Sequence, residues 1–259
     1  MFAVYDGHGE HGQEVSQFCM EFIRDQLSAH PDFERDLGKA LTETFLACDA
    51  AMTDNEAVHC KHSGTTAVVA VLEGSKLTFA SCGDSRAVLA KTCSESADGS
   101  KSMDLTKDHN PDVPEEKARI EAAGGFVKPA TADGFSARVY LNPEFTQVGL
   151  AMARSLGDHC VKGVGVVAEP TIAVYDLEDD DLFFILASDG IWEFISSEFA
   201  VELAAANVLS DEGDATAACQ ELILEAAAKW NEEEGDYRDD ITCMVIKCNP
   251  LDSTDDKVA

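Results

Sequence analysis

The chain has 259 residues, of which 45% are apolar and 26% are charged, a composition typical of a globular protein. Its 49 acidic and 19 basic residues give a net charge of −30, which disfavours binding to nucleic acid or to anionic membranes. No stretch approaches the ~20 apolar residues that span a bilayer, and the first residues lack the features of a signal peptide, so we expect neither a membrane protein nor a secreted disulfide scaffold.

The first half of the chain is predicted to form a strand, two helices, a strand meander and a third helix. The strand covers residues 2–5, and apolar residues at i, i+3 and i+4 spacing predict helices over residues 10–29 and 33–51. Short β-branched runs predict the strands of the meander, over residues 65–72, 77–81 and 87–90. A polar loop over residues 92–103 precedes the third helix, over residues 113–123.

The second half is irregular at first and returns to regular patterns after residue 170. Strands are expected over residues 171–175, 182–187 and 241–248, and helices over residues 197–209 and 215–231. Several strands are unbroken apolar runs, which indicates that both of their faces are covered. Meandering strands between helices, without strand–helix–strand alternation, predict an α+β fold of two stacked antiparallel sheets flanked by helices.

Nine cysteines are scattered along the chain, and an odd number cannot all pair internally. None belongs to a Cys-x-x-Cys motif, so neither a zinc ribbon nor a thioredoxin-like site is indicated. We expect reduced thiols that pack as small apolar residues, in a protein of the cytoplasm or nucleus.

The segment Gly7-His8-Gly9-Glu10-His11-Gly12 matches the glycine spacing of a dinucleotide-binding loop. A second helix is predicted where that fold requires a second strand with an acidic residue at its end. Asp6 and two histidines also crowd the place where a pyrophosphate would lie. An oxidoreductase using NAD(P) therefore stays an alternative that this loop alone supports.

Two histidine pairs, His8 with His11 and His59 with His62, have spacings that zinc ligands can have. Neither pair is joined by a second pair at the spacing of a zinc site, so we expect surface or core histidines. The chain also lacks a G-x-S-x-G elbow, a phosphate-binding P-loop and a cysteine followed by five residues and an arginine. Covalent catalysis thus has no candidate nucleophile.

Four aspartates lie at the ends of apolar strands. Asp6 and Asp189 each follow such a strand and precede a glycine, and Asp239 and Asp240 precede the last strand. Each alone reads as a turn residue or a helix cap. A carboxylate at the edge of a buried strand is costly unless it is paired or bound to a metal, and oxygen ligands favour Mg²⁺ or Mn²⁺. Their recurrence at strand ends indicates a metal site.

A series of motifs, in order from residue 1 to about residue 248, resembles the metal-dependent protein serine/threonine phosphatases of type 2C (the PPM family). The motifs are Phe-Ala-Val-Tyr-Asp6-Gly7-His8-Gly9, Ser63-Gly64-Thr65-Thr66-Ala67, Cys82-Gly83-Asp84-Ser85-Arg86, Leu105-Thr-Lys-Asp108-His109-Asn-Pro111, Glu116-Lys-Ala-Arg-Ile120 with Gly124-Gly125, Ala151-Met-Ala-Arg-Ser155-Leu-Gly-Asp158, Glu169-Pro170, Ala187-Ser-Asp189-Gly190-Ile-Trp192 and Arg238-Asp239-Asp-Ile-Thr242.

The resemblance implies a four-layer α-β-β-α sandwich with two Mg²⁺ or Mn²⁺ ions at one end. By the family's pattern, Asp6 bridges both ions, Gly7 offers its carbonyl, and Asp189 and Asp239 hold one ion. Asp108 with Asp189 would hold a third, weaker ion. His8 matches the family's general acid, which suits a reaction in which water is the nucleophile.

The chain departs from the family pattern in three places. The family's N-terminal strand carries an arginine that grips phosphate and a metal-binding glutamate, and both lie upstream of the Asp6 strand. We therefore expect an N-terminally truncated catalytic domain over residues 1–250 and an acidic tail over residues 251–259. Asp240 replaces the usual asparagine, which adds a charge beside Asp239. Residues 142–149 also differ, so contacts to substrate in this segment are not assigned.

The sequence supports two main hypotheses. The first is a phosphatase that acts on phosphoserine and phosphothreonine in proteins, with two or three Mg²⁺ or Mn²⁺ ions, and that binds neither nucleic acid nor membrane. The second is a binding protein with the same fold, a pseudophosphatase, which the missing arginine and glutamate would favour. For either we expect a monomer in the cytoplasm or the nucleus.

Overall fold

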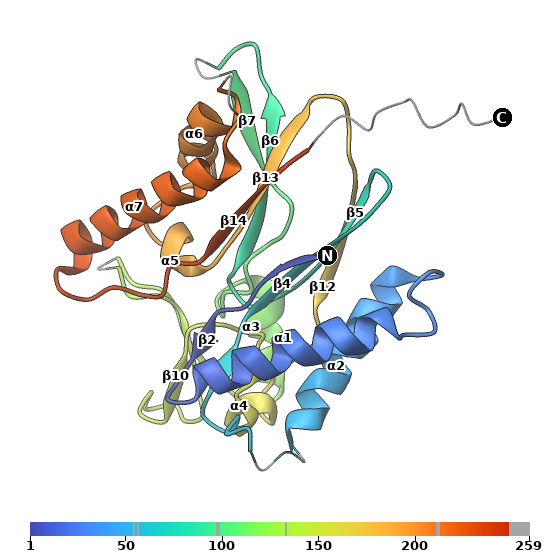
Figure 1. Cartoon of the computed structure of the whole chain (residues 1–259). Helices are drawn as coiled ribbons and strands as arrows, with labels where there is room; N and C mark the ends of the chain where they lie inside the picture. The colour runs from blue at the N-terminus through green and yellow to red at the C-terminus, as the bar shows by residue number, and fades with distance from the viewer. Residues whose placement is uncertain (54, 56, 97–98, 133, 211–212, 249–259) are drawn as a thin grey trace.

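Two four-stranded antiparallel sheets pack face to face, and a pair of helices covers the outer face of each (Figure 1). The computed structural model describes residues 1–53, 55, 57–96, 99–132, 134–210 and 213–248. The predicted α+β class and the four-layer α-β-β-α sandwich are confirmed.

The first sheet has the strand order β1-β4-β5-β12. Its strands are Phe2–Val4, Ala67–Glu73, Lys76–Cys82 and Thr171–Asp176. The second sheet has the order β14-β13-β6-β7. Its strands are Cys243–Lys247, Asp181–Ala187, Arg86–Thr92 and Ser100–Asp104.

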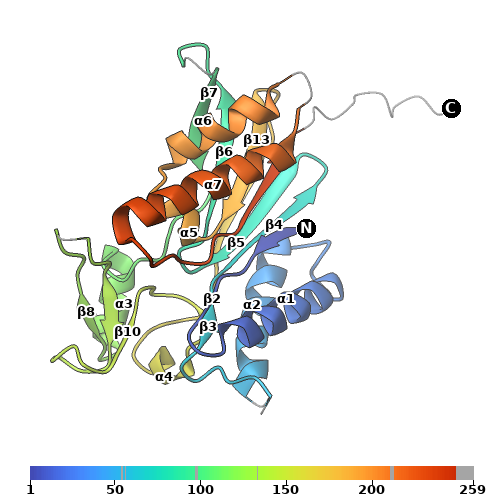
Figure 2. The same cartoon turned by 60° about the vertical axis from the view of Figure 1, so that its left-hand side comes forward.

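The long helices lie on opposite sides of the two sheets (Figure 2). Helices α1 (Gly12–Ser28) and α2 (Leu37–Thr53) pack on the first sheet. Helices α6 (Ser197–Val208) and α7 (Ala215–Glu234) pack on the second. Within the described residues, no helix is long and apolar enough to cross a membrane.

Covered faces explain the unbroken apolar runs of the central strands. Successive side chains of a strand point to opposite faces. In β4, Val68 and Ala70 face the second sheet, whereas Val69 and Val71 face α1 and α2. Both sets must be apolar, so the alternation typical of a half-exposed strand is absent.

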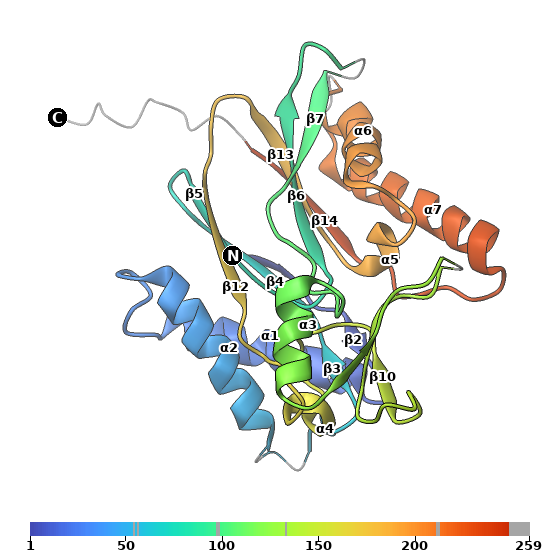
Figure 3. The ribbon, with the colours of Figure 1, turned by 180° about the vertical axis from the view of Figure 1, so that it is seen from behind.

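The region between residues 124 and 170, which shows no pattern in the sequence, contains several short elements (Figure 3). A three-stranded sheet consists of β8 (Phe126–Lys128), β9 (Arg138–Tyr140) and β10 (Val148–Leu150). A second small sheet joins β2 (Gly7–His8), β3 (Gly64–Thr65) and β11 (Leu156–Gly157). The short helix α4 (His159–Lys162) also lies in this region. Helix α3 (Pro114–Ala122) precedes the region and α5 (Asp189–Trp192) follows it. Strands of two or three residues are too short to show a period.

Other differences concern element boundaries. The second helix begins at Leu37 rather than residue 33, because the side chain of Asp36 accepts a hydrogen bond from the backbone N–H of Lys39 and caps the helix. The predicted loop over residues 92–103 ends early, since Ser100 already begins β7. The predicted acidic tail lies outside the described residues, and the single domain over residues 1–250 stays a prediction.

Candidate active site

A cleft of about 740 Å³ lies at the end of the sandwich, where β2, α5 and β10 come together (Figures 1 and 3). Its wall is strongly acidic. The acidic residues that line it are Asp6, Asp84, Asp189, Glu193, Glu234 and Asp239. Among the described lining residues, Arg138 is the only lysine or arginine.

Asp6 follows β1 and is fixed by Thr66, which lies between β3 and β4. The backbone N–H of Asp6 donates to Thr66 Oγ1 at 3.1 Å, and the Asp6 carbonyl accepts from the Thr66 N–H at 2.9 Å. Burial, with the charges of Asp189, Asp239 and Asp84, raises the pKa of Asp6 to about 9. Without a cation, this carboxyl group holds its proton at neutral pH.

Asp189 begins α5 directly after β13, and the neighbouring chain holds that turn in place. The Ser188 hydroxyl donates to the Asp240 carbonyl and accepts from the Thr242 N–H, both at 3.1 Å. A Cβ at Gly190 would collide with the Asp240 carbonyl, so this position requires glycine. Burial and the charge of Asp239 raise the pKa of Asp189, although a hydrogen bond with Asp6 opposes this.

Asp84 is a site residue that the sequence analysis did not assign. It lies in the turn between β5 and β6 and is 8% exposed. Burial and the charges of Asp189 and Asp108 raise its pKa to about 8. The sequence Gly83-Asp84-Ser85 is also typical of an ordinary turn, so only the resemblance marked it.

Glu193 also escaped the sequence analysis. It is the C-cap residue of α5, four residues after Asp189, and that spacing places both side chains on one face of the helical turn. Burial, then Asp189 and Asp239, raise the pKa of Glu193. The i, i+4 spacing was the signal that could have revealed it.

Gly7 and Asp239 line the cleft, as the resemblance implies. Asp239 Oδ1 accepts a hydrogen bond from the Asp240 backbone N–H at 2.8 Å. The Asp240 side chain itself is exposed. The charge that replaces the family's asparagine therefore points toward solvent.

Asp108 is not brought into this cleft. Its carboxylate accepts two hydrogen bonds from Arg86, from Nε at 2.9 Å and from Nη2 at 2.6 Å. Arg86 also donates to Ser197 at the start of α6 and lies 5.3 Å from the centre of the Trp192 ring. The role of Asp108 in a third metal site stays a prediction: its carboxylate forms a bidentate ion pair with Arg86, and its charge, with that of Asp189, raises the pKa of Asp84.

His8 lies in the cleft and is paired with Asp158. His8 Nε2 is 2.7 Å from Asp158 Oδ2, with Asp158 almost fully buried. Burial by itself lowers the pKa of His8, but the hydrogen bond and charge of Asp158 outweigh it and raise that pKa overall. Nδ1 of His8 is buried and has no hydrogen-bond partner within the described part of the chain.

Close packing explains the glycine loop that matched a dinucleotide fingerprint. A Cβ at Gly7 would collide with the Gly12 carbonyl, and a Cβ at Gly12 would lie 2.5 Å from the Gly7 carbonyl carbon. Gly9 has a φ of +82° and would meet Ser63. The glycines therefore allow β2 to lie against the start of α1, and α2 follows α1 with no intervening strand.

The residues of the cleft fit divalent cations. Asp84 Oδ1 and Asp189 Oδ1 are buried without a hydrogen-bond partner, as far as the structure is described. Buried carboxylates that repel one another need a positive partner, and donors that are all oxygen suit Mg²⁺ or Mn²⁺. Among the described residues, no three of the cleft carboxylates have ligand atoms that all lie within 4.8 Å of one another. The carboxylates are therefore spread more widely than the ligands of a single ion.

Aromatic rings form one side of the cleft mouth. Trp230 contacts Phe194 at 4.7 Å and Tyr237 at 5.8 Å between ring centroids. Phe135, which is 73% exposed, and Arg138, which donates to the Gly149 carbonyl, also line the cleft. Such a mouth can contact the chain on either side of a modified residue.

The comparison with family models decides the assignment. The model described as "Protein phosphatase 2C" matches residues 1–235. The chain belongs to this family. Probable protein phosphatase 2C 69 of Arabidopsis thaliana is 33% identical over 249 residues, which are 95% of this chain and 61% of that protein. Protein phosphatase 2C homolog 3 of Schizosaccharomyces pombe is 38% identical over 211 residues, which are 78% of this chain and 45% of that protein.

Solved structures agree on the fold of this phosphatase 2C family member. A serine-threonine phosphatase 2C from Toxoplasma gondii superposes with a TM-score of 0.81 at 23% identity, over 95% of this chain and 84% of that one. A sex determining protein of C. elegans superposes with a TM-score of 0.74 at 23% identity, over 96% and 56%. The chain spans 61%, 44% and 48% of the lengths of three of its plant relatives.

Proposed function

We propose that this chain is a phosphatase that hydrolyses phosphoserine and phosphothreonine monoesters in proteins with the help of Mg²⁺ or Mn²⁺. The observation that carries the proposal is the cluster of Asp6, Asp84 and Asp189, whose burial and mutual repulsion a cation would relieve. Family membership supports the same activity. Because the chain spans only part of its relatives' length, the activity of the whole protein is included in the proposal.

The cleft residues divide between two ions and a weaker third. Asp6, the Gly7 carbonyl, Asp189 and Asp239 would hold the two ions. Asp84 and Asp189 would hold the third, and the part of Asp108 in that site stays a prediction. When bound, such ions lower the pKa of a water molecule and neutralise charge on the phosphoryl group.

His8 is the group that protonates the departing serine or threonine oxygen. Asp158 occupies Nε2, so the ring presents Nδ1, which has no other partner among the described residues. The hydrogen bond and charge of Asp158 raise the pKa of His8, which favours the protonated ring. An alkoxide is a poor leaving group, so a proton supplied at Nδ1 speeds the cleavage.

Substrate contacts beyond the phosphate come from the cleft mouth. Arg138 is the only lysine or arginine among the described lining residues, and the exposed rings of Phe135 and Tyr237 offer surface to the neighbouring residues of a phosphoprotein. The monomeric state and the cytoplasmic or nuclear location stay predictions.

The activity is tested by hydrolysis of p-nitrophenyl phosphate with Mn²⁺. Asp189→Asn should lower kcat by about 10²-fold or more, because one neutral amide replaces a carboxylate ligand. Asp240→Asn is the matched control, since its side chain is exposed and its turnover should stay close to that of the native chain. Hydrolysis that persists in EDTA, or that Asp189→Asn leaves intact, would contradict the proposal. Absence of any turnover by the native chain with Mn²⁺ would favour the binding protein instead.

A further inference from the structure

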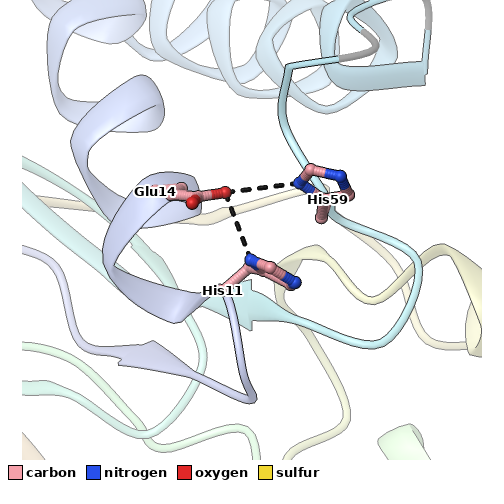
Figure 4. Close-up of side chains that lie close together, drawn as sticks. All are labelled: His11, Glu14 and His59. Atoms are coloured by element: carbon pink, nitrogen blue, oxygen red, sulfur yellow. Dashed lines mark hydrogen bonds and ion pairs between the residues drawn. The ribbon is translucent and has the colours of Figure 1, made fainter.

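Histidines from two distant segments meet outside the catalytic cleft. His11 is the residue before α1, Glu14 lies in the first turn of that helix, and His59 belongs to the loop between α2 and β3 (Figure 4). The sequence showed two histidine pairs, each without a second pair. In the structure a histidine of the first pair faces a histidine of the second.

The donor atoms of these three side chains converge. His11 Nδ1 is 3.3 Å from Glu14 Oε2, and His59 Nδ1 is 3.4 Å from the same oxygen. The three ligand atoms all lie within 4.8 Å of one another. The two imidazole rings stack with centroids 4.5 Å apart.

These separations are those of long hydrogen bonds, and they also suit the ligands of one metal ion. A charge-assisted N–H···O bond is about 2.7–2.9 Å long. Zinc bonds of about 2.0–2.1 Å in a tetrahedral site place neighbouring ligand atoms about 3.3–3.4 Å apart. Both nitrogen–oxygen separations here match that tetrahedral edge.

Two other clusters of this kind already contain a lysine. Glu178, Asp180 and Asp181 surround the Lys91 ammonium at 2.6, 3.1 and 3.0 Å. In the cluster of His30, Asp32 and Glu43, Lys39 lies 2.6 Å from Asp32. Glu14, by contrast, has ion pairs only with His11 and His59 among the residues described.

Both segments are held in place before any ligand binds. The backbone N–H of His11 donates to Ser63 Oγ at 3.0 Å, which ties the start of α1 to the loop that carries His59. A cavity of about 650 Å³, lined by His11, His59 and His62 among others, borders the cluster. Water could complete the coordination from this side.

We propose that His11, Glu14 and His59 form a Zn²⁺ site that fastens α1 to the loop before β3. Two imidazoles and one carboxylate are a known ligand set for zinc, whereas Mg²⁺ and Mn²⁺ prefer oxygen ligands alone. The site is separate from the carboxylate cleft, and its ligands take no part in the proposed hydrolysis.

The test is isothermal titration of Zn²⁺ into the full chain in excess Mg²⁺, which occupies the oxygen-rich cleft. The native chain should bind one equivalent of Zn²⁺. His59→Ala and Glu14→Gln should each lower the affinity for this ion by about tenfold or more. His62→Ala is the matched control, because it removes a histidine of the same loop and should leave the equivalent intact. Co²⁺ offers a second readout, since the absorption of its tetrahedral complex should vanish in His59→Ala.

The substituted side chains are largely exposed, so the variants should keep the native melting temperature in a chelator. Zinc should raise the melting temperature of the native chain and not that of His59→Ala. Equal zinc affinity and stoichiometry in the native chain and His59→Ala would overturn the proposal. Loss of the equivalent in His62→Ala would overturn the assigned ligand set.

Discussion

Asp6 and Asp84 are carboxyl groups that the folded protein keeps protonated when no cation is near. Their pKa values are raised to about 9 and about 8, chiefly by burial and by Asp189. A metal ion binds only the ionised form, so it must displace these protons. The site therefore couples metal binding to pH through named residues.

We predict that the affinity for Mn²⁺ rises as pH increases from 6 to about 9. The measurement is calorimetric titration at several pH values, repeated in two buffers of different ionisation enthalpy to count the protons released. A dissociation constant that does not change with pH, with no proton release, would show that the carboxyl groups are already ionised.

Asp158 acts through His8. Asp158→Asn removes the charge that raises the pKa of His8, so burial should dominate and the ring should lose its proton at lower pH. We predict that kcat for a phosphoserine peptide falls by about 10²–10⁴-fold at neutral pH and that the alkaline limb of its pH profile moves to lower pH.

The control for this prediction is a change of substrate. p-Nitrophenolate leaves readily without a proton, so Asp158→Asn should slow hydrolysis of p-nitrophenyl phosphate much less than that of the peptide. An equal loss on both substrates would assign Asp158 a structural role.

The sequence predicted part of the site and missed part of it, for physical reasons. Asp6, Asp189 and Asp239 lie where apolar strands end, and this pattern is visible in one dimension. Asp84 was missed because burial, which is a property of the fold, distinguishes it from any other turn residue. The pairing of Asp108 with Arg86 was not predicted, because it joins residues 22 positions apart that no local pattern connects.

At the scale of elements, Glu116 joins α3 to the segment after β10. Its carboxylate is 2% exposed and lies 2.6 Å from Arg154 and 2.7 Å from Arg119. Burial alone would raise its pKa, but the hydrogen bonds from both arginines lower it to about 2. The ion pairs hold an otherwise irregular region against α3.

We predict that Glu116→Ala lowers the free energy of unfolding by about 3 kcal/mol, because it leaves two half-buried guanidinium groups, those of Arg119 and Arg154, without their carboxylate partner. Glu121→Ala removes an exposed partner of Lys117 at 3.8 Å. This substitution should change the free energy of unfolding by less than about 1 kcal/mol. Urea unfolding monitored by circular dichroism measures both. Similar losses for the two variants would refute the role of Glu116.

The ion pairs of Glu116 also make the stability of the folded chain depend on pH. Since the pKa of Glu116 is lower in the folded chain than its ordinary 4.5, its contribution is complete above pH 4.5 and disappears as pH falls toward 2. The difference in stability between the native chain and Glu116→Ala should shrink over that range. A constant difference would contradict this assignment.

Element length decides what the sequence could predict at this scale. Helices α1 and α7 contain enough turns for an apolar face to repeat, and both were predicted. Strands β8, β9 and β10 have three residues each and take their shape from contacts with α3 and with one another, so no period revealed them.

At the scale of the whole molecule, the net charge of −30 bears on the substrates expected of the proposed phosphatase. A surface of this sign attracts basic segments and repels acidic ones, and salt screens both effects. We predict that kcat/KM is about tenfold or more higher for a phosphopeptide with basic flanks than for one with acidic flanks at low salt. The ratio of the two kcat/KM values should approach one at about 0.5 M salt. A ratio that does not change with salt concentration would rule out steering by charge.

The sandwich itself was predictable because two properties agreed along the chain. Unbroken apolar strands required cover on both faces, and the long amphipathic helices before and after them supplied it. How these layers bring Asp6, Asp189 and Asp239 to one end of the molecule is a property of the assembled sheets, and the sequence alone gave no distance between them.

The most direct test of the central claim is phosphate release from a phosphothreonine peptide while Mn²⁺ is titrated into the full chain stripped of metal. We predict no turnover without metal, a saturable rise with Mn²⁺, and no comparable rise for Asp189→Asn. Turnover that is already maximal in the chelator would contradict a cation-dependent cleft built on Asp6 and Asp189.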